Sequence, residues 1–157
     1  MSTAHSSITA GWREWVSLPG IGVPWVKAKL DTGARSSAVH AFDITEHDRE
    51  GELWVRYSVH PWQRSDEDAV TAESRVLDRR TVRSSSGHSE ERYVVQLDVS
   101  LVGHVVTAEM TLSRRDEMGF RMLIGREALR KGFVVDPGRS YLGGRPKRVT
   151  RRRNRGR

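Results

Sequence analysis

The triplet Asp31-Thr32-Gly33 is the part of the sequence whose residue types are best suited to chemistry. It follows directly on an alternating apolar segment, so we expect a strand to end at the carboxylate. Gly33 would let the backbone turn sharply through a positive φ, and the Thr32 hydroxyl would tie the loop down. An aspartate in such a turn is more often a turn former or a cap than a catalyst. The triplet therefore predicts a turn, and a second motif is needed to predict catalysis.

A second motif lies about ninety residues later, in Met122-Leu123-Ile124-Gly125-Arg126-Glu127-Ala128-Leu129. Its composition predicts an apolar strand, a glycine and then a short helix. The two motifs together, in this order, resemble those of the retropepsins, the one-lobed aspartic peptidases of retroviral type. That family has a hydrophobic strand that runs into Asp-Thr-Gly-Ala and a later hydrophobic strand that runs into Gly-Arg-x-x-Leu.

Three longer segments resemble one bacterial and archaeal branch of that family more closely. They are Leu30–Ala38, Glu117–Glu127 and Asp136–Tyr141. This branch is labelled an ATP-dependent zinc protease and is associated with ATP-grasp glutamate ligases of the ribosomal-modification type. The likeness covers about residues 12–142. It implies an all-β fold, a single-lobe retropepsin-like β-barrel with one short C-terminal helix.

The resemblance implies an active site that needs two lobes, whereas this chain has one Asp-Thr-Gly. The site would then form across a homodimer, with one Asp31 from each chain around a two-fold axis. Two carboxylates about 3 Å apart repel by roughly 5 kcal/mol at an effective dielectric constant near 20. Such a pair shares one proton. The ionised member would activate a water while the protonated member polarises the peptide carbonyl.

Arg35 departs from the retroviral pattern, in which an acidic residue follows Asp-Thr-Gly-Ala. The change removes the carboxylate that Arg126 would pair with and places a cation beside Ala34 at the mouth of the site. We hypothesise that Ala34 and Arg35 contact the substrate and that Arg35 binds a carboxylate of an acidic peptide. The alternative is that Arg35 forms a salt bridge with Glu127 or Asp136.

A peptidase of this kind also needs a flap over its substrate. The best candidate is Arg83–Ser89, a small polar segment whose tip includes Ser86 and Gly87. An ordinary flexible hairpin is the alternative interpretation.

The sequence gives no support to a zinc or ATP site, so no metal and no cofactor is expected. No His-Glu-x-x-His pair and no Gly-x-x-x-x-Gly-Lys loop is present. We expect His40 and His47 to lie on the surface. The absence of cysteine excludes disulfides and thiolate ligands.

Short apolar runs separated by turn residues predict the strands that must position these residues. We expect two hairpins, a single helix over Arg126–Lys131 that ends at Gly132, and a closing strand at Phe133–Val135. The five tryptophans are expected in the core and at the dimer contact. The strands of the hairpins and one further strand are predicted at Trp12–Leu18, Trp25–Leu30, Leu53–Val59, Arg92–Leu101 and His104–Leu112.

The net charge of +7 comes from the C-terminal tail. Eight of the 27 Lys and Arg residues lie in 145–157, which leaves 19 against 20 Asp and Glu residues in 1–144. We therefore expect a disordered N-terminus over 1–10, a retropepsin-like domain over 11–144 and a basic disordered tail over 145–157. Such a tail would contact RNA or the ribosome, or would only aid solubility.

Two functions fit these features. The first is a homodimeric aspartic endopeptidase with Asp31 as its catalytic carboxylate. The second is a non-catalytic module of the same fold that binds acidic peptides or modulates an ATP-grasp ligase partner. With no apolar run near 20 residues and no secretory signal, we expect a cytoplasmic protein without a membrane partner.

Overall fold

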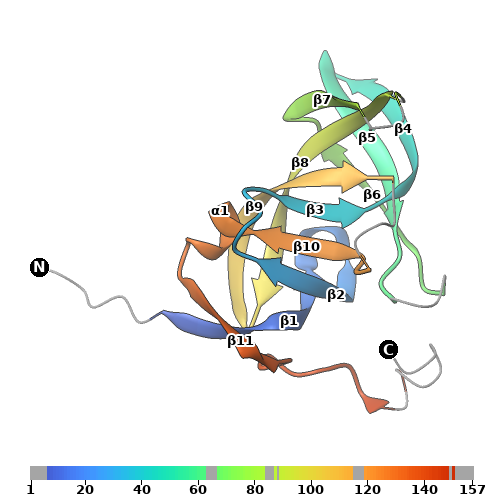
Figure 1. Ribbon diagram of the computed structural model, residues 1–157. Coiled ribbons are helices and arrows are strands. Elements are labelled where there is room, and N and C mark those ends of the chain that lie inside the picture. The colour runs from blue at the N-terminus through green and yellow to red at the C-terminus, as the bar shows by residue number, and fades with distance from the viewer. Residues whose placement is uncertain are drawn as a thin grey trace, which may run out of the picture.

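The computed structural model describes residues 7–62, 67–83, 87, 89–114, 119–148 and 150 (Figure 1). Most of this chain is extended, and one α-helical turn, α1 (Arg126–Leu129), and one 3-10 turn, η1 (Pro19–Ile21), occur in the described part. The strands are β1 (Ile8–Leu18), β2 (Val23–Asp31), β3 (Ser37–His40), β4 (Phe42–Arg49), β5 (Glu52–Val59), β6 (Val70–Arg75), β7 (Asp78–Arg83), β8 (Ser89–Leu101), β9 (His104–Ser113), β10 (Met122–Gly125) and β11 (Phe133–Ser140).

Six of these strands close into a barrel. The larger sheet runs β11-β1-β2-β10-β3-β9-β8-β7, and a further pairing of β1 with β8, at Ser17 and Ser100, joins its two sides. Strands β11 and β7 extend the sheet beyond the closed part, while β4, β5 and β6 form a separate sheet (Figure 1). The expectation of an all-β, single-lobe barrel with one short helix is confirmed.

The barrel is filled by the inward face of each strand. Along β8, Val95, Leu97 and Val99 are buried, whereas the alternating Gln96 and Asp98 are exposed. This period of two is what a half-buried strand requires. Burial of each such aliphatic side chain stabilises the fold by roughly 1.5–3 kcal/mol. The core therefore fixes the register of the strands that hold the two motifs.

Three tryptophans form a cluster beside the barrel. Trp62 is fully buried and contacts Trp15 and Trp25, with ring centroids 5.9 and 5.1 Å away. The Trp62 indole N–H donates to Asp68. Trp15 and Trp62 are buried, as expected of core residues. Trp12, Trp25 and Trp54 are only partly buried.

Both predicted hairpins are confirmed, as β1–β2 and β8–β9. The disorder that we expected over residues 1–10 is wrong for residues 8–10. These residues form the start of β1, because Ile8–Gly11 pairs in parallel with Phe133–Asp136, a partner that lies at the other end of the chain. The helix also ends at Leu129, earlier than expected, and β11 continues to Ser140. In the described part of the chain, no helix has the length and apolar character to span a membrane.

Candidate active site

The two motifs lie side by side in the barrel. Strand β2 ends at Asp31 and pairs in parallel with β10, so that Asp31 is directly opposite Gly125. The polypeptide then forms a loop over residues 32–36, while β10 continues into α1. The structure thus brings Asp31, Thr32, Gly33, Ala34, Arg35, Gly125 and Arg126 together, which are the predicted site residues of the two motifs.

The Asp31 carboxylate is held by its own loop. The Gly33 N–H donates to Oδ1 at 2.9 Å, and the Ala34 N–H donates to the same oxygen at 3.3 Å. Within the described residues no donor contacts Oδ2, and Asp31 is only partly buried. One oxygen therefore orients the carboxylate, and the other remains available for a water or a second acid.

One expectation about this loop is wrong in detail, and the bracing role of the Thr32 hydroxyl across a dimer stays a prediction. Gly33 does not adopt a positive φ. The absence of a side chain at this position instead leaves room for the carboxylate, since an added Cβ would lie 3.2 Å from Asp31 Oδ1. The Thr32 hydroxyl makes no hydrogen bond to the described residues of this chain. It is the Thr32 carbonyl that is held, by the Arg126 guanidinium at 3.3 Å.

The turn into α1 braces the same loop from the other side. The Arg126 N–H donates to the Ala34 carbonyl at 2.7 Å, and the Glu127 N–H donates to the Arg35 carbonyl at 3.0 Å. These are N–H groups of the first helical turn, which have no partner within the helix. The second motif therefore positions the first.

Gly125 is at a position where a side chain does not fit. An added Cβ would lie 2.3 Å from the Ser36 carbonyl oxygen and 2.9 Å from that of Ala34. The Gly125 N–H donates to the buried Ser37 hydroxyl at 3.0 Å. Ser37 was missed by the sequence analysis, and its signal is only a small hydroxyl residue just after the loop.

Arg35 forms the salt bridge that we gave as the alternative. Its Nε lies 2.9 Å from Glu127 Oε1. The hydrogen bond and the charge of Arg35 lower the pKa of the Glu127 carboxyl below its usual value, and Glu127 raises the pKa of Arg35 in turn. The Arg35 side chain is 80% exposed, so its guanidinium still faces solvent.

Two grooves flank this loop. One, of about 380 Å³, is lined by Ser36, Glu109, Glu127 and Lys131 among other residues of the loop, β9, α1 and the turn after α1. The other, of about 240 Å³, is lined by Arg35, Arg80, Glu109 and Glu127. Arg80 and Glu109 were not predicted, because nothing in the sequence shows that β7 and β9 border this loop.

The candidate flap is only partly described. Strands β7 and β8 form the hairpin, with Arg83 opposite Ser89. Gly87 is exposed, with φ 86°. Ser86 lies outside the described residues, so its predicted substrate contact stays a prediction.

The described histidines give no sign of a metal site. In the described ranges, no group of three or more His, Asp or Glu residues could hold a metal ion. The surface position expected for His40 is wrong. His40 is buried at the end of β3, with its ring centroid 5.9 Å from that of His60.

The sequences of several relatives match most of this chain. A probable alpha-L-glutamate ligase of Shewanella halifaxensis is 47% identical over 131 residues, which are 83% of this chain and 29% of the relative. A probable alpha-L-glutamate ligase of Parasynechococcus marenigrum is 43% identical over 134 residues, 85% of this chain and 29% of the relative. The chain thus spans less than a third of the length of these relatives.

A solved structure shares the fold. A protein of unknown function from Legionella pneumophila superposes with a TM-score of 0.71 at 26% identity, over 86% of this chain and 97% of that one. The model of the RimB-like family, described as retropepsin-like aspartic endopeptidase RimB, matches residues 9–146. This chain therefore belongs to the RimB-like family of retropepsin-like proteins.

Proposed function

We propose that this protein is an aspartic endopeptidase whose active site forms between two copies of the chain. The observation that supports it best is the state of Asp31. Two backbone N–H groups hold one of its carboxylate oxygens, and the other oxygen has no donor among the described residues. A general base needs this combination of fixed orientation and a free lone pair.

The homodimer follows from the number of carboxylates. One chain supplies one Asp-Thr-Gly loop, whereas the chemistry needs one ionised and one protonated carboxyl group. A two-fold axis beside Asp31 would bring the second loop. Repulsion of roughly 5 kcal/mol between the two charges would keep one proton on the pair. The ionised Asp31 then takes a proton from the attacking water, and the protonated Asp31 donates to the carbonyl oxygen.

An acidic peptide is the substrate class that we favour. Arg35 and Arg80 line one groove beside the loop together with Glu109 and Glu127, and the exposed guanidinium of Arg35 is the group there that is suited to a carboxylate. Glu127 already occupies that guanidinium, so a substrate carboxylate must displace it.

Two substitutions test this preference in opposite directions. Arg35→Ala is expected to weaken binding of a glutamate-rich peptide several-fold and to leave a neutral peptide unchanged. Glu127→Gln frees Arg35 and is expected to tighten binding of the glutamate-rich peptide. Equal effects on both peptides, or no effect of either substitution, would remove the acidic preference without touching the peptidase proposal.

A second candidate is a binding module that modulates a ligase. Relatives that match this chain over less than a third of their own length are named probable alpha-L-glutamate ligases. A unit that is part of a ligase chain in relatives is a natural partner for a separate ligase of the ATP-grasp type. In this case binding would survive Asp31→Asn and no peptide would be cut.

Mixed dimers test whether the active site is shared between two chains. Wild-type and Asp31→Asn chains are mixed in equal amounts and exchanged, and cleavage of a peptide library is measured per wild-type chain. If each site needs two Asp31 residues, activity per wild-type chain falls to about half, since half of these chains then pair with a variant. Activity that stays unchanged on mixing would mean that one chain suffices, and would overturn the shared site.

A further inference from the structure

A second carboxylate fixes the segment that follows β11. Glu14 is fully buried, and its Oε2 accepts the N–H of Gly11 at 2.7 Å and of Leu142 at 2.9 Å. Its Oε1 accepts the N–H of Gly143 at 3.0 Å. The chain after Tyr141 is thereby tied down against β1.

Cations lie over aromatic rings beside this anchor. The Arg13 guanidinium is 4.8 Å from the Trp12 ring and 4.9 Å from that of Tyr141. Arg145 stands 4.5 Å from the Tyr141 ring, and the Lys27 ammonium lies 5.2 Å from the Trp15 ring. Such contacts hold a cation in place without neutralising its charge.

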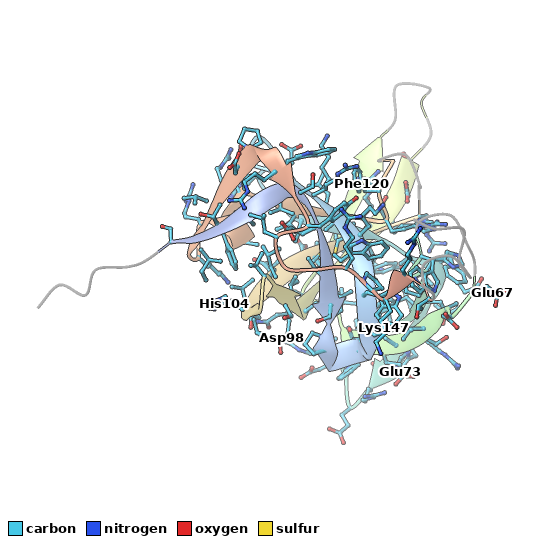
Figure 2. The ribbon with its side chains drawn as sticks, turned by 90° about the horizontal axis from the view of Figure 1, so that it is seen from below. Glu67, Glu73, Asp98, His104, Phe120 and Lys147 are labelled. Atoms are coloured by element: carbon cyan, nitrogen blue, oxygen red, sulfur yellow. The ribbon has the colours of Figure 1, made fainter. Side chains whose placement is uncertain are left out.

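A groove of about 480 Å³ runs beside the anchored segment. Trp15, Pro24 and Trp25 form one part of its lining, and Arg145 and Lys147 belong to the other. Figure 2 shows the C-terminal segment passing over the blue N-terminal strands, with Lys147 near its end. No acidic residue of the described chain lines this groove, in contrast to the two grooves beside Ser36, which include Glu109 and Glu127.

The cations of this face are available to a ligand. Arg145, Lys147 and Arg148 are exposed and form no salt bridge with the described residues. Five more arginines follow in residues 151–157.

We infer that this basic face, made of Trp25, Arg145, Lys147 and Arg148, binds single-stranded nucleic acid. Exposed cations bind the phosphates, while an aromatic wall and guanidinium planes stack against bases. The cations alone would suit any polyanion, whereas the partly exposed ring of Trp25 favours a ligand that carries flat aromatic bases. The inference is independent of the proposed peptidase function, since the groove shares no residue with the Asp31 loop.

The test is fluorescence anisotropy with a labelled single-stranded oligonucleotide, titrated with full-length protein at several salt concentrations. Arg145→Gln/Lys147→Gln is expected to weaken binding about ten-fold and to reduce the salt slope by about 1.4, the value for two lost phosphate contacts. The matched control is Arg56→Gln/Arg130→Gln, which removes the same charge from exposed positions on β5 and just after α1. The control is expected to bind like the wild type.

An abasic oligonucleotide of the same length separates stacking from charge. We expect it to bind at least about ten-fold more weakly, because base–aromatic stacking is lost. Equal losses in both variant pairs would overturn the basic face as the site. Equal affinity for the abasic strand would overturn the recognition of bases by this face and would point to polyanions in general.

Discussion

Asp31 and Glu14 each accept several backbone N–H groups, and they do so in opposite surroundings. Asp31 accepts two N–H groups from its own loop, both on one oxygen, and stays partly exposed. Glu14 accepts one N–H group from its own strand and two from the distant residues Leu142 and Gly143, uses both oxygens and is fully buried. Glu14 has no lone pair directed to solvent, whereas Asp31 has one oxygen to spare.

The difference indicates that Glu14 has a structural role and that Asp31 is suited to catalysis. A buried carboxylate is tolerated only when its hydrogen bonds are satisfied, and removing it leaves the donors unpaired. When a carboxylate that keeps a free oxygen is substituted, the protein loses little stability. It loses the reaction that this oxygen would carry out. Substitutions at the two positions should therefore affect different measurements.

The largest effect on stability is expected for Glu14→Ala. It leaves three buried or half-buried N–H groups without an acceptor, at about 1–3 kcal/mol each. We expect the free energy of unfolding to fall by about 3–5 kcal/mol, as measured by urea denaturation. Asp31→Asn, which keeps an acceptor oxygen for both N–H groups, should change it by less than about 1 kcal/mol. Similar losses of stability in the two variants would contradict a structural role for Glu14 that Asp31 lacks.

Gly125→Ala should have the next largest effect. Its methyl group would meet the Ser36 carbonyl at 2.3 Å, so either β10 or the Asp31 loop must move. We expect a loss of about 2–3 kcal/mol in the free energy of unfolding, typical of overpacking, and reduced cleavage because the loop shifts. Gly20→Ala is the control, since no atom lies within 4 Å of its added Cβ. An unchanged thermal midpoint in Gly125→Ala would show that the close approach does not hold the loop.

The smallest effect concerns Glu127. Arg35 lowers the pKa of the Glu127 carboxyl, so the ion pair stabilises the fold above the usual glutamate pKa and is lost as the pH falls through the lowered value. Arg35→Ala should raise the pKa of Glu127 toward its usual value, as measured by NMR titration of its side-chain carbonyl. A pKa that does not move would mean that the pair is not populated in solution.

The barrel and the Asp31 loop could be predicted from the sequence. The parts of the structure that depend on long-range contacts could not. Asp31 and Gly125 were found because each ends an apolar strand and belongs to a recognisable motif. Strands β3, β4 and β6 were missed, since they are short or polar on one face. Glu14 gave no signal at all. Its role depends on Leu142 and Gly143, at the other end of the chain.

Arg35 shows a limit of another kind. Its type and position predicted a cation at the mouth of the site, and two partners were open. Only the three-dimensional register of α1 against the loop decides that Glu127 is the partner. The substrate role of Arg35 stays a prediction.

The most direct test of the account is cleavage of a mixed peptide library by purified wild-type protein and by Asp31→Asn, from about pH 4 to pH 8, with and without a chelator. We predict cleavage by the wild type that resists the chelator and falls by a factor of at least about 10²–10⁴ in the variant, the range for a lost acid–base group. Circular dichroism should show both proteins equally folded. Cleavage that survives in Asp31→Asn, or its absence from a folded, dimeric wild type, would contradict the assignment of Asp31 as the catalytic carboxylate.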